Sequence, residues 1–156
     1  MSEGAQASVR GGGGGHVTAL HVAATRGGDV SHLDAIEVDR LGIHGDRHRR
    51  SRYRRGTAVT LVAEEDVEAC AQAIGATLST ADSRRNVATR GVDLAALVGH
   101  RFRVGTSVLL GVERCDPCGR LERRTVRGVR GQLHGGLRCD VLEGGRIAVG
   151  DLVETA

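Results

Sequence analysis

Two cysteines stand three residues apart in the segment CDPCGRLE, which covers residues 115–122. The thiols of Cys115 and Cys118 could bind a metal, exchange electrons as a dithiol, carry a reactive sulfur atom or pack in a core. Arg114, Arg120 and the N-terminus of any short helix that begins near the proline would lower the pKa of a thiol here. A lower pKa means more thiolate at neutral pH, and the thiolate is the reactive form.

The cysteine spacing also allows a structural zinc site. Cys118 is followed by His134 and then by Cys139, in the pattern C-x2-C-x15-H-x4-C. Three thiolates and one imidazole are a common zinc ligand set. However, Leu137, Cys139 and Val141 share one face of a predicted strand, so the Cys139 sulfur is expected to point into the core. A zinc site would then lose a ligand.

The Cys-x-Pro-Cys pattern is also the spacing of thioredoxin-like dithiols. Those dithiols require a strand that leads directly into a helix within a βαβ unit. The strands expected here instead follow one another as a meander, with frequent glycines between them. Dithiol redox chemistry is therefore disfavoured.

A second group of candidate residues lies in LGIHGDRHRRSRYRRG, residues 41–56, which we call the basic segment. It contains six arginines, His44, His48 and a single acid, Asp46. Such a cationic loop is suited to a phosphate or another oxyanion, and the alternative is a solvated loop without a ligand. RNA is disfavoured, because Tyr53 is the only stacking surface and the net charge is only +3.

A third group lies in SRRNVATRG, residues 83–91. Arg84, Arg85 and Asn86 place donors and an acceptor side by side, which could bind a phosphate or a heterocycle. An Asn that satisfies local backbone groups is the commoner case. Both interpretations stay open at this point.

The composition limits the elements that position these groups. A chain of 156 residues is long enough for one domain with one hydrophobic core. With one Phe, one Tyr and no Trp, the core must consist of Val, Leu, Ile and Ala, and 24 glycines suit many tight turns. Short strands are therefore favoured over a large helical bundle.

Hydrophobic periodicity predicts the elements themselves. Residues 63–75, AEEDVEACAQAIG, are predicted to form an amphipathic helix that ends at Gly75, with Cys70 as a buried, inert thiol on its apolar face. Residues 92–99 are predicted to form a short helical turn. The predicted strands cover residues 16–25, 34–38, 58–62, 101–104, 107–113, 137–143, 145–150 and 151–154. This count predicts a mostly β fold, a closed or nearly closed β-barrel with a few short helices.

The ends of the chain suggest one domain with a leader. Residues 1–15, MSEGAQASVRGGGGG, have almost nothing to bury and are expected to be a disordered Gly-rich leader, with residues 16–156 as the single domain. No signal sequence or membrane-spanning run is recognised. A cytoplasmic protein with reduced thiols is the resulting expectation.

Six segments in order along the chain resemble the MOSC domain, named for the C-terminal domain of molybdenum cofactor sulfurase. They are GIHGDRH, VTLVAEE, RRNVATRGVDL, LVGHRFRVG, LLGVERCDPCGRLE and GGLRCDVLEGGRIAVGDLV. The likeness extends from about residue 35 to residue 154. It implies a barrel like those of MOSC and pyruvate-kinase barrel domains, in a small standalone member of the family.

The resemblance also implies a cysteine that carries sulfur as a persulfide, or that ligates molybdenum when the pterin cofactor is bound. This cysteine matches Cys118, because relatives with one thiol here keep the one after the proline. Cys115 would be auxiliary, and His134 could act as an acid or base. The residues expected to hold the molybdenum cofactor or another anion are His44, Asp46, Arg47, His48, Arg85 and Asn86.

The leading hypothesis is therefore a pyridoxal phosphate-independent sulfur carrier. Its Cys118 would accept sulfane sulfur from a donor such as a cysteine desulfurase and pass it to an acceptor. The alternatives are a molybdenum-cofactor carrier or oxidoreductase module with Cys118 as the metal ligand, and a structural zinc domain. If the protein is an enzyme, a sulfurtransferase-like or molybdenum-cofactor-dependent activity is expected. No nucleic acid or membrane partner is expected, and the oligomeric state is left open.

Overall fold

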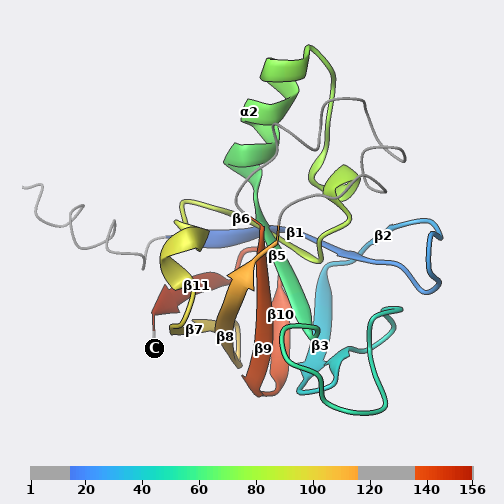
Figure 1. The fold of residues 1–156 in the computed structure, drawn as a ribbon, viewed down its shortest axis with the longest axis vertical. Helices are drawn as coiled ribbons and strands as arrows, with labels where there is room; N and C mark the ends of the chain where they lie inside the picture. The colour runs from blue at the N-terminus through green and yellow to red at the C-terminus, as the bar shows by residue number, and fades with distance from the viewer. Residues whose placement is uncertain (1–14, 116–135, 156) are drawn as a thin grey trace, which may run out of the picture.

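The structure is a computed structural model that describes residues 15–115 and 136–155. Figure 1 shows short strands packed around one another, with one longer helix extending away from them. The helices are α2 (Glu64–Ile74) and the short 3-10 turns η2 (Thr80–Ser83) and η3 (Leu94–Leu97). The strands are β1 (Gly15–Val22), β2 (Ser31–His32), β3 (Ala35–Asp39), β4 (Gly42–Ile43), β5 (Val59–Ala63), β6 (Val87–Arg90), β7 (Arg101–Val104), β8 (Ser107–Arg114), β9 (Leu137–Glu143), β10 (Gly145–Ala148) and β11 (Leu152–Thr155).

Seven strands close into a barrel in the order β11-β7-β8-β9-β5-β6-β1. The ring is completed where β1 pairs with β11, through Gly15 with Val153 and His16 with Leu152. Closure removes the exposed edges that an open sheet would present. Strand β2 extends β1 outside the ring, and β10, β3 and β4 form a separate sheet. The predicted mostly β, barrel-like fold is confirmed.

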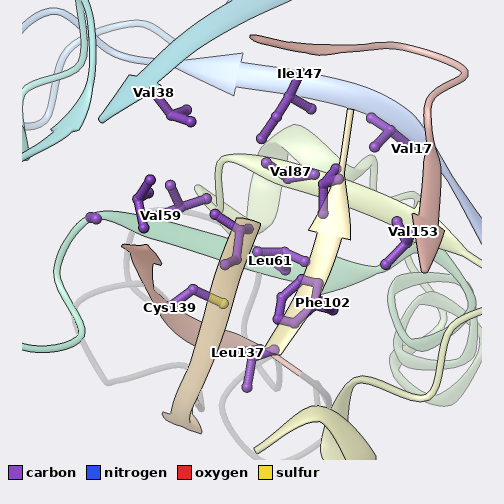
Figure 2. Packing of buried hydrophobic residues seen from close by; sticks show 14 of the residues in the cluster. Val17, Val38, Val59, Leu61, Val87, Phe102, Leu137, Cys139, Ile147 and Val153 are labelled. Atoms are coloured by element: carbon purple, nitrogen blue, oxygen red, sulfur yellow. The ribbon is translucent and has the colours of Figure 1, made fainter. Parts of the chain in front are cut away.

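The barrel interior is filled mainly by aliphatic side chains, as the composition predicts. Figure 2 shows Phe102 among Leu61, Leu137 and Val153, and Phe102 is the only aromatic residue in this buried cluster. Its strand β7 reads RFRV and alternates exposed and buried positions. Cys139 lies in the same cluster and is 0% exposed, so the prediction that its sulfur points into the core is confirmed.

Helix α2 packs on the outside of the barrel. Its Val67 and Cys70 are buried against Val62 of β5 and Ala88 of β6. The helix follows β5 directly and ends at Gly75, which adopts a left-handed conformation with φ of 69°. Burial raises the pKa of the Cys70 thiol. The predicted helix and its buried thiol are both confirmed.

Strands β5 and β6 pair in parallel, so β5, α2 and β6 form a βαβ unit. The meander expected from the sequence is wrong at this point. The sequence of Val87–Arg90 does not predict a strand, because arginines and Asn86 surround three small residues. The Cys115 segment follows β8 and not β5, so this βαβ unit does not give it a thioredoxin-like context.

Within the described ranges, no helix combines the length and the apolar character needed to cross a membrane. Residues 1–14, most of the expected leader, lie outside these ranges, and β1 begins at Gly15.

Candidate functional site

The carboxylate of Asp46 attaches the basic segment to the end of β1. Its Oδ1 accepts a hydrogen bond from the Ala23 backbone N–H at 3.1 Å, and its Oδ2 accepts one from the His48 N–H at 3.1 Å. The Arg47 N–H donates to the Ala23 carbonyl at 2.8 Å. Gly45, with φ of 89°, allows the turn that aims these groups at the strand. The GDRH turn is therefore fixed in position.

Asp46 also faces the side chains of Arg47 and His48. Arg47 Nη1 lies 3.7 Å from Asp46 Oδ1, and His48 Nδ1 lies 3.7 Å from Asp46 Oδ2. Burial lowers the pKa of His48, and the neighbouring Arg47, Arg50 and Arg138 lower it further, while Asp46 opposes them. His48 is therefore mainly neutral at pH 7, and its imidazole can both donate and accept a hydrogen bond.

His44 belongs to a different cluster. Its Nε2 lies 2.9 Å from Asp39 Oδ2, which also accepts a hydrogen bond from Arg49 at 2.5 Å. Partial burial raises the pKa of Asp39, but the hydrogen bonds from His44 and Arg49 outweigh it and lower the pKa to about 2. In the described part of the chain, no hydrogen bond or ion pair joins His44 to Arg85 or Asn86.

Asn86 links two strands of the barrel. Its Oδ1 accepts hydrogen bonds from the Thr60 backbone N–H at 3.1 Å and from Thr60 Oγ1 at 3.0 Å. Its Nδ2 donates to the His21 carbonyl at 3.1 Å, and the residue is only 4% exposed. Asn86 therefore satisfies backbone groups, but those of distant strands and not the local ones that the sequence interpretation names. A role for Asn86 in ligand binding stays a prediction.

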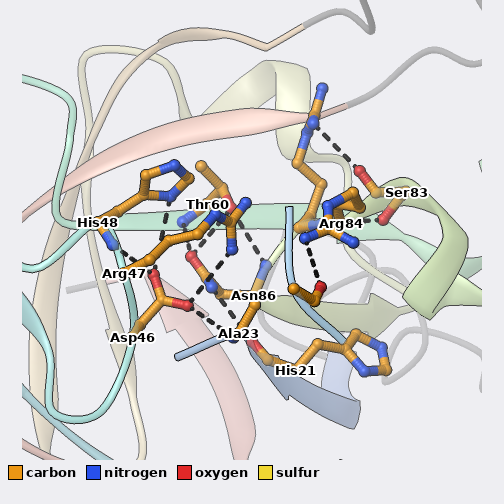
Figure 3. Close-up of polar contacts among 11 residues, drawn as sticks. His21, Ala23, Asp46, Arg47, His48, Thr60, Ser83, Arg84 and Asn86 are labelled. Carbon is orange, nitrogen blue, oxygen red and sulfur yellow. Dashed lines mark hydrogen bonds and ion pairs between the residues drawn. The ribbon is translucent and has the colours of Figure 1, made fainter. Parts of the chain in front are cut away.

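Two of the predicted groups meet at the end of β1. Asn86 donates a hydrogen bond to the His21 carbonyl, and Asp46 accepts one from the N–H of Ala23, two residues later in the chain. Figure 3 shows Asp46, Arg47 and His48 beside the Thr60 and Asn86 side chains. The structure therefore brings together Asp46, Arg47, His48 and Asn86.

Arg85 connects this region to the first cysteine of the CDPC segment. Its Nη2 donates to the Cys115 carbonyl at 3.0 Å and its Nη1 donates to the Ser83 carbonyl at 3.2 Å. The Cys115 N–H in turn donates to the Gly136 carbonyl at 2.8 Å. A Cβ at position 136 would lie 2.3 Å from the Cys115 carbonyl oxygen, so glycine permits this close approach. Cys118 and His134, two of the predicted catalytic residues, lie outside the described residues.

The two described cysteines of the zinc pattern are buried. Cys115 is 7% exposed and Cys139 is 0% exposed. Burial raises the pKa of Cys139 well above its ordinary value, and the nearby Asp140 and Cys115 raise it further. In residues 15–115 and 136–155, no three His, Cys, Asp or Glu side chains are placed to hold a metal. A protonated thiol in an aliphatic core is a poor zinc ligand, which argues against the four-ligand zinc site.

Two residues on β9, Arg138 and Asp140, belong to this region although their sequence pattern did not predict it. Asp140 accepts hydrogen bonds from Tyr53 Oη and from the Gly56 N–H, both at 2.7 Å, and so holds the far end of the basic segment. Arg138 is exposed and lies near His48, and its Nε is 3.6 Å from Glu113 Oε2. An Asp in the middle of an apolar strand is unusual, and this signal could have identified Asp140.

The surface of the basic segment is hollowed. Residues 47–54 line an open hollow of about 550 Å³, and five of these eight residues are arginines. Guanidinium groups around an open hollow favour an anionic ligand over a neutral one.

Comparisons with known proteins agree with this architecture. A family model described as MOSC domain matches residues 47–154. The YuaD protein from Bacillus subtilis superposes with a TM-score of 0.73 and 22% identity, over 90% of this chain and 95% of that one. YiiM from Escherichia coli gives a TM-score of 0.66 and 16% identity, over 90% of this chain and 69% of that one.

YiiM from Geobacillus stearothermophilus gives a TM-score of 0.66 and 14% identity, over 91% of this chain and 75% of that one. At these identities the structural likeness shows the fold. No curated protein matches the chain.

Proposed function

Because the chain belongs to the MOSC family, we propose that it handles sulfur through Cys118, which carries a sulfane sulfur atom as a persulfide. The proposed ligand or partner is anionic and binds at the basic surface, which we define as Arg47, His48 and Arg138. MOSC domains are associated with molybdenum cofactor biology. The proposed sulfur acceptor is therefore a molecule that takes part in molybdenum cofactor metabolism.

The observation that supports this proposal most directly is the hydrogen bond from Arg85 to the Cys115 carbonyl. Arg85 directly precedes Asn86, so this bond holds the start of the cysteine segment beside Asn86. Asn86 is hydrogen-bonded to His21 on β1, two residues before Ala23, to which Asp46 is hydrogen-bonded. The peptide chain limits the distance between the Cα atoms of Cys115 and Cys118 to about 11 Å. A reactive thiol on this segment would therefore be within reach of the basic surface.

The proposed chemistry needs no external oxidant. The Cys118 thiolate attacks the outer sulfur of a donor persulfide, a new S–S bond forms on Cys118, and the donor S–S bond breaks as the donor leaves as a thiolate. In the second step an acceptor nucleophile takes the outer sulfur and Cys118 leaves as a thiolate. Nearby guanidinium groups would stabilise the anionic sulfur in both steps.

Whole-protein mass spectrometry tests the proposal after incubation with a cysteine desulfurase and L-cysteine. The expected product carries one additional sulfur atom, which a thiol reductant removes. Cys118→Ala should not gain this sulfur. Cys70→Ala is the matched control and should gain it normally, because Cys70 lies on α2 and is buried against Val62 and Ala88.

A Cys118→Ala protein that still gains the reducible sulfur would contradict the proposal, as would a wild-type protein that remains unmodified. Cys115→Ala measures the auxiliary role of the first thiol. If Cys115 only resolves or positions the persulfide, its removal should change the lifetime of the modified form and not its formation.

A second candidate function is binding of the molybdenum cofactor. The observation that favours it is the basic surface, where guanidinium N–H groups and a mainly neutral imidazole fit a phosphate group. Arg47 and Arg138 would hold that phosphate, Cys118 would be the metal ligand, and the bound group would supply molybdenum redox chemistry. Protein purified from a cofactor-producing host should then contain molybdenum and yield a fluorescent pterin on oxidation. The absence of both would remove this candidate and leave sulfur transfer to be decided by mass spectrometry.

A further inference from the structure

Two histidines that have no role in the proposed sulfur chemistry face each other on β1 and β2. His21 and His32 are directly opposed partners in the antiparallel pair of these strands. Their ring centroids are 4.8 Å apart, with an interplanar angle of 84°. Directly opposed side chains are the closest neighbours that a sheet provides, so both imidazoles can reach a common ligand.

His21 has a buried ring nitrogen without a hydrogen-bond partner. The residue is 2% exposed, and its Nε2 lies 2.9 Å from Thr80 Oγ1. Its Nδ1 is inaccessible to solvent and has no partner within the described residues. Buried polar atoms of native proteins are nearly always paired, and an unpaired one indicates a missing water, ion or functional role.

The contact with Thr80 resembles the support that metal-binding histidines usually have. When Nε2 carries the proton and donates it to the Thr80 hydroxyl, Nδ1 presents its lone pair. Burial, with a smaller contribution from His32, lowers the pKa of His21 to about 4. His21 is therefore neutral at pH 7, which is the form that binds metals.

The spacing of the two rings agrees with coordination to one ion. A metal–nitrogen bond of about 2.1 Å, with the ring centre about 1.2 Å behind the nitrogen, places two ring centres roughly 4.6–5.4 Å apart at bond angles of about 90–110°. The observed 4.8 Å falls in this interval. His32 is exposed and lies on a two-residue strand, so its ring can rotate to turn a nitrogen toward the ion.

We propose that His21 Nδ1 and the imidazole of His32 bind a divalent first-row transition-metal ion that joins β2 to β1. Water completes the coordination from the exposed side of His32, because the described residues hold no group of three candidate ligands. Imidazole ligands favour Cu²⁺ most, with Ni²⁺ and Zn²⁺ binding less tightly. This inference does not depend on the proposed sulfur chemistry.

Titration of ¹⁵N-labelled protein with Ni²⁺, followed by NMR of the histidine rings and by calorimetry, tests the site. The titration uses a Cys118→Ala background, so that the thiol in the CDPC segment does not compete for the metal. The expected result is one saturable site, with paramagnetic broadening of the His21 and His32 signals that a chelator reverses.

His32→Ala is the decisive variant because His32 is exposed and its loss should leave the fold intact, whereas His21→Ala removes a buried side chain. The proposal expects affinity for Ni²⁺ to fall by more than about tenfold in His32→Ala. His100→Ala, which removes an exposed histidine before β7, should bind Ni²⁺ as the parent does. Unchanged affinity in His32→Ala, or broadening that leaves the His21 signals sharp, would overturn the proposal.

Discussion

At the scale of single residues, Asn86 shows how one amide can serve a structural role in a segment that looks like a binding site. Its side chain bridges Thr60 on β5 and His21 on β1, and it is almost fully buried. The neighbouring Arg85 instead extends to the Cys115 carbonyl. Adjacent residues of one polar segment therefore act on different parts of the molecule.

Replacement of Asn86 by Ala should destabilise the protein by about 2–4 kcal/mol, because the Thr60 N–H and the His21 carbonyl lose their buried partner. Urea denaturation measures this loss. Gln72→Ala, an exposed amide on α2, is the control and should change the free energy of unfolding by no more than about 0.5 kcal/mol. Equal losses in the two variants would show that Asn86 is not the structural link described here.

His21 should make the stability of the protein sensitive to mild acid. Its pKa is about 4 in the folded state and 6.5 as the ordinary value, so the unfolded chain binds the proton more readily. The free energy of unfolding is therefore highest above pH 6.5 and should fall by about 2 kcal/mol, after allowance for solvent screening, as the pH decreases toward 4. Urea denaturation across this range should show a weaker pH dependence in His21→Gln than in wild type. His100→Gln should keep the wild-type dependence.

At the scale of elements, the basic segment is held by a carboxylate at each end. Asp46 attaches one end to β1, and Asp140 attaches the other end to β9. Between them Arg50, Arg52 and Arg54 are exposed around the open hollow, whereas Arg47 is mostly buried beside Asp46. This double attachment presents the guanidinium groups on a shaped loop, which would lower the entropy cost of binding the proposed anion.

Tyr53 reports the attachment at Asp140, because it is the only tyrosine and the chain has no tryptophan. The hydrogen bond from Tyr53 to Asp140 raises the pKa of the phenol above its ordinary value of 10. In Asp140→Asn the phenol pKa should return toward 10, as measured by ultraviolet absorbance during a pH titration. Asp151→Asn, which alters a carboxylate bonded to Ala148, should leave the tyrosine titration unchanged. A wild-type tyrosine that titrates at its ordinary pKa would contradict this attachment.

At the scale of the whole molecule, the barrel is a closed ring with a mainly aliphatic core and polar side chains on its outside. The interior holds aliphatic side chains, Cys139 and one aromatic ring, and the polar groups gather where the basic segment, the start of β6 and the end of β8 meet. Closure by β1 and β11 keeps these elements in a fixed relation to one another.

Phe102 should contribute most to this core because it is the largest fully buried side chain. Phe102→Ala should destabilise the protein by about 3–5 kcal/mol, since the aliphatic neighbours cannot collapse to fill the cavity. Denaturant unfolding measures the loss. Phe102→Leu should cost less than about 1.5 kcal/mol. Leu152→Ala, at a residue that is 54% exposed, should have little effect, and a large effect there would contradict the assigned core.

The amino-acid sequence by itself determined the local features of this protein. Alternation along RFRV and LRCDVLE predicted the apolar side chains of β7 and β9 that face the core, including Cys139. The helical spacing of apolar residues predicted α2, and the glycine that follows them predicted its end at Gly75. These features depend on residues that are neighbours in the chain, so a short window contains the information.

The tertiary structure decided which distant residues meet. The parallel pairing of β5 with β6, the closure of β1 on β11, the Arg85 contact with Cys115 and the Tyr53 contact with Asp140 join residues far apart in the chain. Hydrophobic alternation specifies which face of a strand is buried but not which strand lies beside it, because pairing depends on how the whole ring closes and packs.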